Sequence, residues 1–359
     1  MSANHPSPLR SGIIGAGFIG GVHAYAVRSA GGHLTRVADA TLEAATTAAI
    51  ALGADAPSAS AEELINSPDV DVVHICTPNS THAALAQLAV DSGKAVICEK
   101  PLATTAADAR ALAEGAARAG VVTAVPFVYR FHPNIREIRQ RIVSGDAGHV
   151  WLVHGSYLQD WLSRSVDTNW RVDPTTGGVS RAFGDIGVHW CDLMEFTTGQ
   201  RIVRLAARLG KAFDTRPGTE DGAVIIFETD TGASGSLVVS QVSPGRKNRL
   251  WFSFDGTHAS YSFDQETPDL LWVGGRDESR LLMRDPVQEH IEAQRLSRLP
   301  AGHPQGYQDA FSAFVSDVYA AVRGQRPSGL PSFDDGLRAA QITEAVVASA
   351  AADTWIDVA

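Results

Sequence analysis

Apolar runs and helical patterns alternate along the first third of the chain. The run "RSGIIGAGFIGGVHAYAVRSAGG" predicts a short buried strand, a glycine turn and a helix, and "HLTRVADA" predicts the next strand. A helix near 41–53, a helix that begins at "SAEEL", a strand over 70–76, a further helix and the strand in "KAVICEKPLA" continue the alternation. Strands that alternate with helices are typical of a doubly wound parallel sheet.

The pattern changes after "VTAVPFVYRFHPN". Strand-like runs then follow one another, among them "HVWLVHGSYLQDW", "GAVIIFETDTGASGSLVVSQV" and "RLWFSFDGTHASYSFD", with "DTG" and "DGT" as hairpin turns. We expect antiparallel strands with a helical insertion, and a helical, Ala-rich tail from Phe333 onwards. The predicted fold class is α/β, with a doubly wound parallel domain over 1–125 and an α+β domain with a large, mostly antiparallel sheet over 126–359.

Composition and charge limit the classes of protein to which the chain can belong. The chain has 359 residues, of which 44% are hydrophobic and 19% charged, as in ordinary globular enzymes. Its formal net charge of -10 argues against a nucleic-acid partner, which requires a basic surface. No apolar run approaches the roughly eighteen residues of a membrane span, and the first residues lack the apolar core of a secretion signal. We therefore expect a cytoplasmic protein whose Cys76, Cys98 and Cys191 are reduced packing residues.

The glycine turn indicates a dinucleotide site. Gly15, Gly17 and Gly20 fit the spacing G-x-G-x-x-G between a strand and a helix, and Asp39 ends the next strand. Gly15 would form the turn, Gly17 would let the backbone approach a pyrophosphate, and Gly20 would let the helix pack on the strand. An acid at Asp39 would bond the ribose hydroxyls and repel a 2'-phosphate, which favours NAD over NADP. The alternative is that Asp39 is an exposed loop acid.

Two further segments end at the same edge of the predicted sheet. The loop after the strand over 70–76 contains "TPN" and His82, and the strand in "KAVICEKPLA" runs into Glu99 and Lys100, whose backbone Pro101 keeps extended. His82 has an equally good alternative as a surface residue of a first helical turn. The candidate cofactor contacts are Gly15, Gly17, Phe18, Ile19, Gly20, Asp39, Thr77, Pro78, Asn79, His82, Glu99 and Lys100.

A third candidate site lies in "GDIGVHWCDLM". Gly184 and Asp185 look like a helix start, His189 follows one turn later on the same face, and Asp192 is three residues further on. A metal site, an acid-base device and a polar patch inside a core all fit this spacing. A metal site would need three or four ligands of suitable geometry, so no metal is expected.

Four stretches together resemble the Gfo/Idh/MocA family of sugar and cyclitol dehydrogenases: "GAGFIGGVH", "CTPNSTHAALAQLAVDSGKAVICEKPLA", "FVYRFHPNIREI" and "GGVSRAFGDIGVHWCDL". The resemblance implies a Rossmann domain followed by a large sheet whose outer face forms a homodimer or homotetramer. It also implies that the C-terminal helix, about 334–352, packs back near the first domain. Lys100, Asp185 and His189 would be catalytic, with His189 as base, Lys100 bonded to the reacting oxygen and Asp185 as an orienting acid.

The resemblance further implies a polyhydroxylated substrate, because neutral sugars require many directional hydrogen bonds. A pyranoside or an anhydrosugar such as levoglucosan, oxidised at a ring hydroxyl and often at C3, is expected first, and inositol is the rival. Glycoside cleavage through transient C3 oxidation with NAD retained, and a non-catalytic sensor of NAD or sugar, are the other classes. The candidate substrate contacts are Tyr129, Arg130, Gln159, Asp160, Trp161, Trp170, Arg171, Asp185, His189 and His303, with Asn134, Asn169 and Tyr307 on the same stretches.

Overall fold

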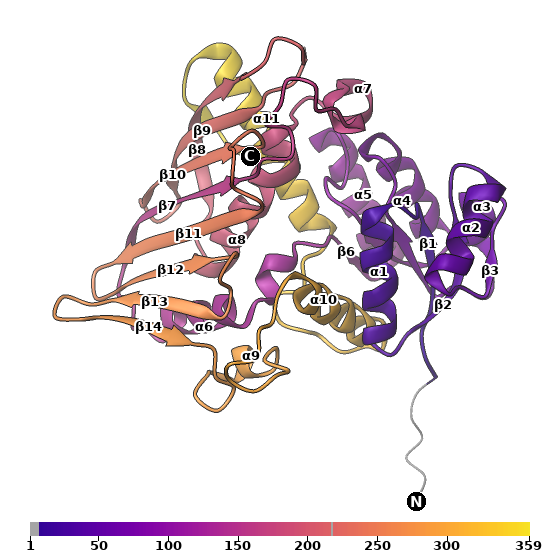
Figure 1. The fold of residues 1–359 in the computed structure, drawn as a ribbon, viewed down its shortest axis with the longest axis horizontal. Coiled ribbons are helices and arrows are strands. Elements are labelled where there is room, and N and C mark those ends of the chain that lie inside the picture. The colour runs from indigo at the N-terminus through magenta and orange to yellow at the C-terminus, as the bar shows by residue number, and fades with distance from the viewer. Residues whose placement is uncertain (1–6, 217) are drawn as a thin grey trace, which may run out of the picture. The chain divides into compact units, whose positions relative to one another are not determined.

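The computed structural model describes residues 7–216 and 218–359, which divide into two compact units with a sheet each (Figure 1). Unit 1 comprises the described residues up to Ala103, together with Ala107–Pro126 and Phe311–Leu337. Unit 2 comprises Thr104–Ala106, Phe127–Ala310 and Arg338–Ala359. The domain limits at 125 and 126 stay a prediction. Among the described residues, no helix is long and apolar enough to cross a membrane.

Unit 1 contains a parallel sheet of six strands in the order β3-β2-β1-β4-β5-β6. The strands are β1 (Arg10–Ile14), β2 (His33–Ala38), β3 (Ala56–Pro57), β4 (Val72–Ile75), β5 (Ala95–Cys98) and β6 (Thr123–Ala124). The order reverses between β1 and β4. In sheets of this kind, ligands bind at the carboxyl ends of the strands beside that reversal.

Capping residues fix the ends of two helices of unit 1, α2 and α3. The Thr41 side chain accepts a hydrogen bond from the Ala44 N–H at the start of α2, and Ser60 caps α3 in the same way. Gly53 ends α2 in the left-handed region, with φ of 66°. The helical segments are α1 (Phe18–Ser29), α2 (Leu42–Leu52), α3 (Ala61–Asn66), η1 (Asn79–Thr81), α4 (His82–Asp91), α5 (Ala106–Ala119) and α10 (Tyr307–Val322), the last from Phe311 onwards.

Residues from late in the chain complete unit 1. The Tyr319 hydroxyl of α10 lies 2.6 Å from the Ser11 hydroxyl of β1, and both side chains are buried. The Phe311 ring packs edge-on against His23 of α1, with 4.7 Å between ring centroids. The Val125 N–H donates to the Pro331 carbonyl oxygen. The first two contacts attach α10 to the first strand, β1, and to the first helix, α1, of unit 1.

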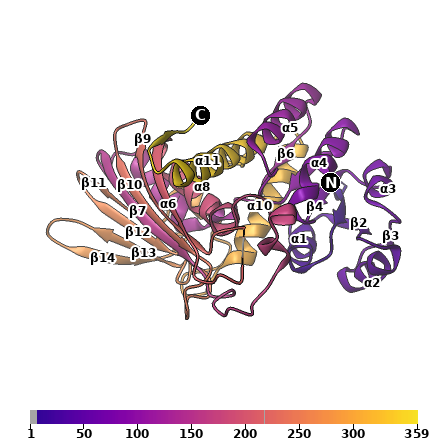
Figure 2. The ribbon, with the colours of Figure 1, turned by 90° about the horizontal axis from the view of Figure 1, so that it is seen from above.

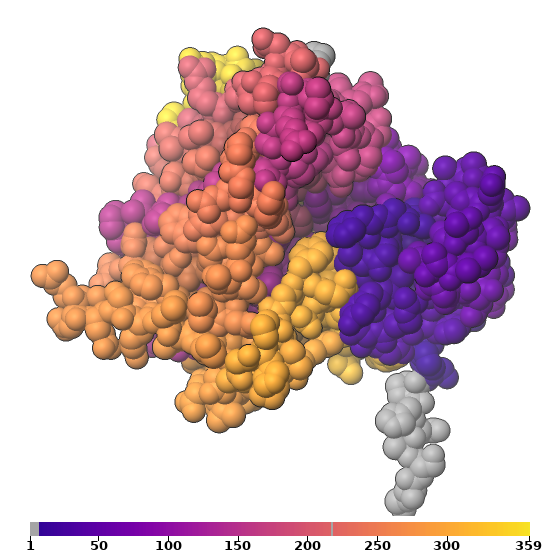
Figure 3. Space-filling view, in the orientation of Figure 1, coloured from indigo at the N-terminus to yellow at the C-terminus, as the bar shows by residue number. Residues whose placement is uncertain are grey.

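Unit 2 contains nine strands in the order β14-β13-β12-β11-β7-β10-β9-β8-β15, antiparallel except for the parallel pair β7 and β10. The expected fold class, a parallel sheet plus a large and mostly antiparallel one, is confirmed. The strands are β7 (Val150–Leu158), β8 (Ile202–Gly210), β9 (Gly222–Thr229), β10 (Ser234–Ser240), β11 (Arg249–Gly256), β12 (Ser260–Asp264), β13 (Leu270–Gly274), β14 (Ser279–Met283) and β15 (Ile356–Asp357). The β13–β14 hairpin projects at one edge (Figure 3, orange).

Helices cover one face of this sheet, as seen for α6, α8 and α11 in Figure 2. The Trp190 side chain of α8 is fully buried and packs against Phe227 of β9 and Phe252 of β11. Its Nε1–H donates to the Trp251 carbonyl oxygen at 2.9 Å. The helical segments are η2 (Val128–Phe131), α6 (Pro133–Val143), η3 (Trp170–Val172), α7 (Pro174–Gly177), η4 (Phe183–Gly187), α8 (Val188–Thr198), α9 (Ile291–Gln294) and α11 (Phe333–Ala352), the last from Arg338 onwards.

Gly155 of β7 gives the first prediction, because a Cβ there would lie 2.3 Å from Trp190 Nε1 and 2.3 Å from the Trp251 carbonyl oxygen. Gly155→Ala should lower the free energy of unfolding by about 1–3 kcal/mol through overpacking. Chemical denaturation measures this change. Gly210→Ala is the matched control, since a Cβ at the end of β8 meets only one atom, at 3.9 Å. Equal stability of the two variants would contradict the packing described here.

Candidate active site

The turn between β1 and α1 has the shape that an anion site requires. Gly15 has φ of +90°, and a Cβ on it would lie 2.8 Å from the Cys76 backbone. A Cβ on Gly20 would lie 2.3 Å from the Gly15 carbonyl oxygen, so the helix can approach the turn only without one. Gly17 has open space at its Cβ position and places no side-chain cap on α1. The first N–H groups of α1 therefore face open space, where a pyrophosphate would fit.

Asp39 follows β2 and bonds back to this turn. Its Oδ2 accepts from the Ala16 N–H at 2.9 Å, and its Oδ1 accepts from the Ala40 N–H at 2.7 Å. Each carboxylate oxygen keeps a second lone pair, so both can still accept from ribose hydroxyls. Asp39 is thus a half-buried part of the turn rather than a free loop acid.

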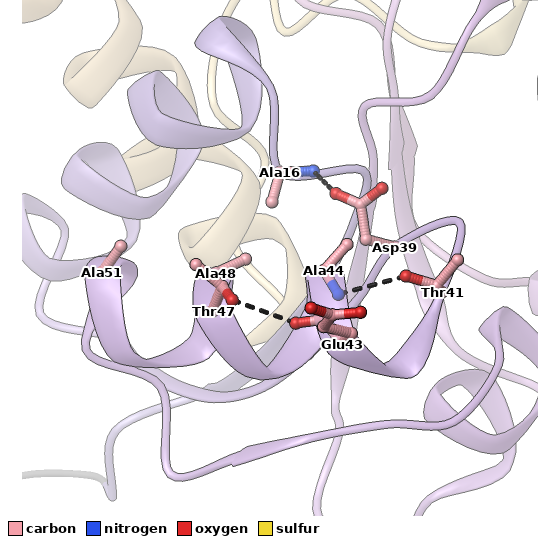
Figure 4. Close-up of a pocket in the computed structure, with 8 residues that line it drawn as sticks. All are labelled: Ala16, Asp39, Thr41, Glu43, Ala44, Thr47, Ala48 and Ala51. Atoms are coloured by element: carbon pink, nitrogen blue, oxygen red, sulfur yellow. Dashed lines mark hydrogen bonds between the residues drawn. The ribbon is translucent and has the colours of Figure 1, made fainter.

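A pocket of about 530 Å³ lies beside Asp39 (Figure 4). Its lining is mostly small, and it includes a second acid, Glu43, from the first turn of α2. Among the described residues, the lining contains two carboxylates and no basic side chain. The lining residues are Ala16, Asp39, Thr41, Glu43, Ala44, Thr47, Ala48 and Ala51. Glu43 was not singled out from the sequence, where an acid in a first helical turn is an ordinary feature.

The loop after β4 is tied to the segment after β5 by a buried histidine. His82 Nδ1 lies 2.7 Å from the Pro101 carbonyl oxygen, and Nε2 lies 2.8 Å from the Thr77 carbonyl oxygen. Burial lowers the pKa of His82. The hydrogen bonds to the two carbonyl oxygens raise it, but burial is the larger effect. His82 is therefore buried rather than on the surface. The loop itself is exposed at Pro78 and half-buried at Thr77 and Asn79, and the Thr77 hydroxyl accepts from Thr81.

Glu99 and Lys100 follow β5. The Glu99 carboxylate is 7% exposed and lies 3.1 Å from His23 Nε2 of α1 through Oε1. Its Oε2 accepts from the backbone N–H of Lys100 at 3.1 Å. Burial raises the pKa of Glu99, but the hydrogen bond and charge of His23 and the charge of Lys100 outweigh burial and lower it. The structure thus places an ionised carboxylate directly before Lys100.

Asp185 and His189 lie in unit 2 on one continuous helical segment. Asp185 lies in the first turn of this segment, close to the helix start that the sequence suggested, and this turn, η4, is π-helical and continues into α8. Glycine makes this turn possible, because a Cβ on Gly187 would lie 2.4 Å from the Phe183 ring. Turns of this wider kind are frequent at functional sites. Lys100 belongs to unit 1, so the predicted catalytic set is divided between the two units.

Polar and aromatic side chains surround these two residues. Gln241 Nε2–H donates to Asp185 Oδ2 at 2.7 Å, and Arg171 Nε lies 3.4 Å from Asp185 Oδ1. The His189 ring is 9% exposed and has three aromatic neighbours. Their ring centroids lie at 5.4, 5.7 and 6.5 Å and belong to Tyr129, Phe127 and Tyr157. His189 is therefore a nearly buried imidazole with an anion one turn away.

A line of hydrogen bonds runs from these aromatic residues to Asn248, which directly precedes β11. The two tyrosine hydroxyls lie 2.5 Å apart, and Tyr157 donates to Asn248 Oδ1 at 2.8 Å, so Tyr129 is the donor to Tyr157. Gln159 Nε2–H donates to the same Asn248 oxygen at 2.7 Å, and Trp161 Nε1–H donates to Gln159 Oε1 at 2.8 Å. Burial raises the pKa of Tyr129 to about 12, so its hydroxyl keeps its proton.

The other predicted substrate residues are placed differently. Arg130 is buried and forms a bidentate ion pair with Asp192. Asp160 accepts from Lys247 Nζ at 2.6 Å, and the Arg171 guanidinium lies over the Trp170 ring at 4.2 Å. His303 is exposed. Among the described residues, no three His, Cys, Asp or Glu side chains are grouped as a metal site would need.

Sequence reasoning missed three residues that contact this region: Tyr157, Gln241 and Asn248. The alternation in "VWLVHGSYL" marks Tyr157 as an inward position, but nothing local marks its partner. Gln241 follows β10 and reaches Asp185 of η4, and Asn248 precedes β11 and reaches Tyr157 of β7, across 56 and 91 positions of sequence. Only the tertiary fold brings these residues to their partners.

Comparisons with known proteins agree over the whole chain. A model described as "Oxidoreductase family, NAD-binding Rossmann fold" matches residues 9–127, and the GFO/IDH/MocA C-terminal domain matches residues 135–262. Levoglucosan dehydrogenase of Pseudarthrobacter phenanthrenivorans is 31% identical over 98% of this chain and 98% of that protein. Inositol 2-dehydrogenase of Rhizobium meliloti is 28% identical over 98% and 99%. A levoglucosan dehydrogenase solved with NADH and levoglucosan superposes with a TM-score of 0.91 at 30% identity, covering 98% of this chain and 100% of that one.

Proposed function

Because the chain belongs to the Gfo/Idh/MocA family of NAD-binding oxidoreductases, we propose that it oxidises a secondary ring hydroxyl of a sugar with NAD as cofactor. One observation supports this most: Asp185 and His189 lie one turn apart beside the polar line from Tyr129 to Gln159, which suits a ligand with many hydroxyls. Levoglucosan or another pyranoside is the first candidate substrate, with C3 as the carbon oxidised. A cyclitol is the second candidate, because the inositol dehydrogenase relative covers 98% of this chain.

The residues of unit 1 fit NAD. The open first turn of α1 suits the pyrophosphate, and Asp39 and Glu43 suit the adenosine ribose while repelling a 2'-phosphate. Bound NAD supplies the hydride acceptor. We propose Gly15, Gly17, Phe18, Ile19, Gly20, Asp39, Thr77, Pro78, Asn79, Glu99 and Lys100 as cofactor contacts. His82 would act by joining the loops that carry Thr77 and Pro101.

Three residues of the chain carry the proposed proton chemistry. A neutral His189 ring takes the proton of the reacting hydroxyl while the carbon gives up its hydride. The Lys100 side chain hydrogen-bonds the same oxygen and stabilises the negative charge that develops on it. Asp185, itself held by Gln241 and Arg171, orients a substrate hydroxyl or the imidazole. Further substrate contacts are proposed for Tyr129, Arg130, Gln159, Asp160, Trp161, Trp170, Arg171 and His303.

We also propose that the uncovered face of the unit 2 sheet joins copies of the chain into a homodimer or homotetramer. Apolar side chains of three strands are exposed there, Val224 and Ile226 of β9, Val238 of β10 and Trp272 of β13. Sedimentation of the wild type and of Ile226→Arg tests this, and a monomeric wild type would contradict it. An enzyme that depends on the NAD pool is further proposed to act in the cytoplasm, which cell fractionation tests.

The proposed activity is tested with a panel of pyranosides, anhydrosugars and cyclitols, each assayed with NAD. NADH absorbance should accumulate in proportion to the sugar consumed, and NMR of the product should locate the new carbonyl at C3. Sugar consumption without NADH accumulation would point to cleavage with retained NAD instead. Binding without turnover of any compound would point to a sensor.

The acids beside the turn lead to a prediction about cofactor choice. Asp39→Ser combined with Ala40→Arg should raise kcat/KM with NADP and lower it with NAD, because one acceptor for the ribose hydroxyls is lost and a cation is gained. Glu62→Gln on α3, which is outside the pocket lining, is the control. Steady-state kinetics with both cofactors give the ratio. A wild type that prefers NADP would remove Asp39 from this role.

The position of His189 predicts the pH dependence. Because only the neutral ring accepts a proton, kcat/KM for oxidation should rise with pH through one ionisation near or above the imidazole reference of about 6.5. His189→Ala should abolish this limb and lower the rate by roughly a hundredfold or more. His33→Ala, an exposed histidine of β2, should leave both unchanged. EDTA should have no effect; inactivation reversed by a divalent ion would reassign Asp185, His189 and Asp192 as metal ligands.

A further inference from the structure

Three buried side chains form a line behind Lys100 in unit 1. His74 of β4 and His23 of α1 are both 0% exposed, and their Nδ1 atoms lie 2.9 Å apart. The other nitrogen of His23, Nε2, lies 3.1 Å from Glu99 Oε1. Glu99 Oε2 in turn accepts from the Lys100 backbone N–H. The line thus connects a fully buried strand position to the peptide that carries Lys100.

The contacts allow one arrangement of protons when both rings are neutral. An ionised Glu99 only accepts, so His23 carries its proton on Nε2 and presents a lone pair at Nδ1. His74 must therefore carry its proton on Nδ1 and donate it to His23. His74 Nε2 then carries a lone pair and no hydrogen, and this buried nitrogen has no hydrogen-bond partner among the described atoms. Each N–H along the line points towards Glu99.

The surroundings favour a neutral His74 and an anionic Glu99. Burial lowers the pKa of His74 well below 6.5, and any positive charge on His23 would lower it further, so His74 stays neutral. Around Glu99, burial alone would raise its pKa, and the His23 hydrogen bond is the first contribution that lowers it. The other titratable groups that face this carboxylate are Cys76, Cys98, His82 and Lys100. The Phe311 ring of α10 closes the remaining side of His23.

We propose that His74 and His23 form a directional hydrogen-bonded line that keeps Glu99 ionised and in one rotamer, and that both are positioning residues for Lys100. This proposal rests on the proposed function, in which Lys100 bonds the reacting oxygen. A carboxylate that lost the His23 donor would be buried with less compensation, and would take up a proton or turn towards water. The peptide of Lys100 would then lose its fixed acceptor, and small displacements of a catalytic group are costly.

The kinetic test compares His23→Leu and His74→Leu with His23→Gln, whose amide N–H reaches as far as Nε2. Both leucine variants should lower kcat about tenfold or more with little change in the Kd for NAD, whereas His23→Gln should retain most of the rate. Lys100→Ala gives the loss of kcat expected when the Lys100 side chain is absent altogether. Tyr319→Phe is the matched control, because it removes a buried hydrogen bond of unit 1 away from Glu99. Equal kcat losses in His23→Leu, His23→Gln and Tyr319→Phe would overturn the proposal.

Two readouts separate positioning from simple packing. In His23→Leu, a second ionisation should appear on the acid side of kcat/KM, in addition to that of His189, because loss of the donor raises the pKa of Glu99. In a Glu99→Gln background, His23→Leu should cost much less than in the wild type, since both changes remove one interaction. If the pH profile of kcat/KM is unchanged in His23→Leu, and the kcat losses of His23→Leu and Glu99→Gln are additive, His23 has a packing role only.

A third measurement does not depend on turnover. Nitrogen NMR of the full chain labelled in histidine should show one neutral Nε2–H ring and one neutral Nδ1–H ring, assigned by their loss in His23→Gln and His74→Leu. Stability supports the same assignment. Wild type should lose stability as pH falls below 6.5, the ordinary pKa of His74, and His74→Leu should lose less. A charged ring, or an Nε2–H tautomer at His74, would overturn the line even if the enzyme were active. A wild type that fails the substrate panel while showing these tautomers would instead refute the proposed function alone.

Discussion

The position of α8 on the unit 2 sheet depends on Trp190. Its ring is fully buried over Gly155, between Phe227 and Phe252, and its single polar atom bonds the Trp251 carbonyl oxygen. His189 precedes it in sequence, and successive residues of a helix point about 100° apart. Seating Trp190 against the sheet therefore also fixes the direction of the His189 ring, and the continuous π turn carries this constraint back to Asp185. The geometry of the candidate site follows from core packing.

Both units use directional hydrogen bonds to hold polar side chains in one rotamer. In unit 2 the order is Tyr129 to Tyr157 to Asn248, and in unit 1 it is His74 to His23 to Glu99. Each line ends on an oxygen that only accepts, so each proton has one place. Where each donor in such a line has an acceptor, one arrangement of the core is favoured, because the alternatives leave a buried donor unpaired. This explains how polar groups on separate elements keep a fixed geometry.

The parts of the fold that depend on local chemistry could be predicted from the sequence. The spacing of Gly15, Gly17 and Gly20 with Asp39 specifies a strand, a turn and a helix within thirty positions of chain, and the structure has all of them. The helix beginning at "SAEEL" and the strand-like runs from "HVWLVHGSYLQDW" onwards were predicted for the same reason, whereas α6 (Pro133–Val143), which precedes them, was not. Asn248 and Gln241 escaped prediction because their partners depend on the tertiary fold: Asn248 reaches Tyr157 of β7, and Gln241 reaches Asp185 of η4. The π turn at Asp185 escaped it because its sequence is equally compatible with an ordinary helix start.

Segment Phe311–Leu337 supplies unit 1 with Tyr319 against Ser11 and Phe311 against His23, and places Gly336 against Leu102 and Val125. A ribosome makes these residues only after nearly all of unit 2. In the nascent chain, unit 1 therefore stays incomplete until about nine-tenths of the chain has been synthesised. Until then the Ser11 hydroxyl and one side of the His23 ring are uncovered. During translation, unit 2 can complete its sheet up to β14 before unit 1 obtains its last helix, so the domain that begins first is finished late.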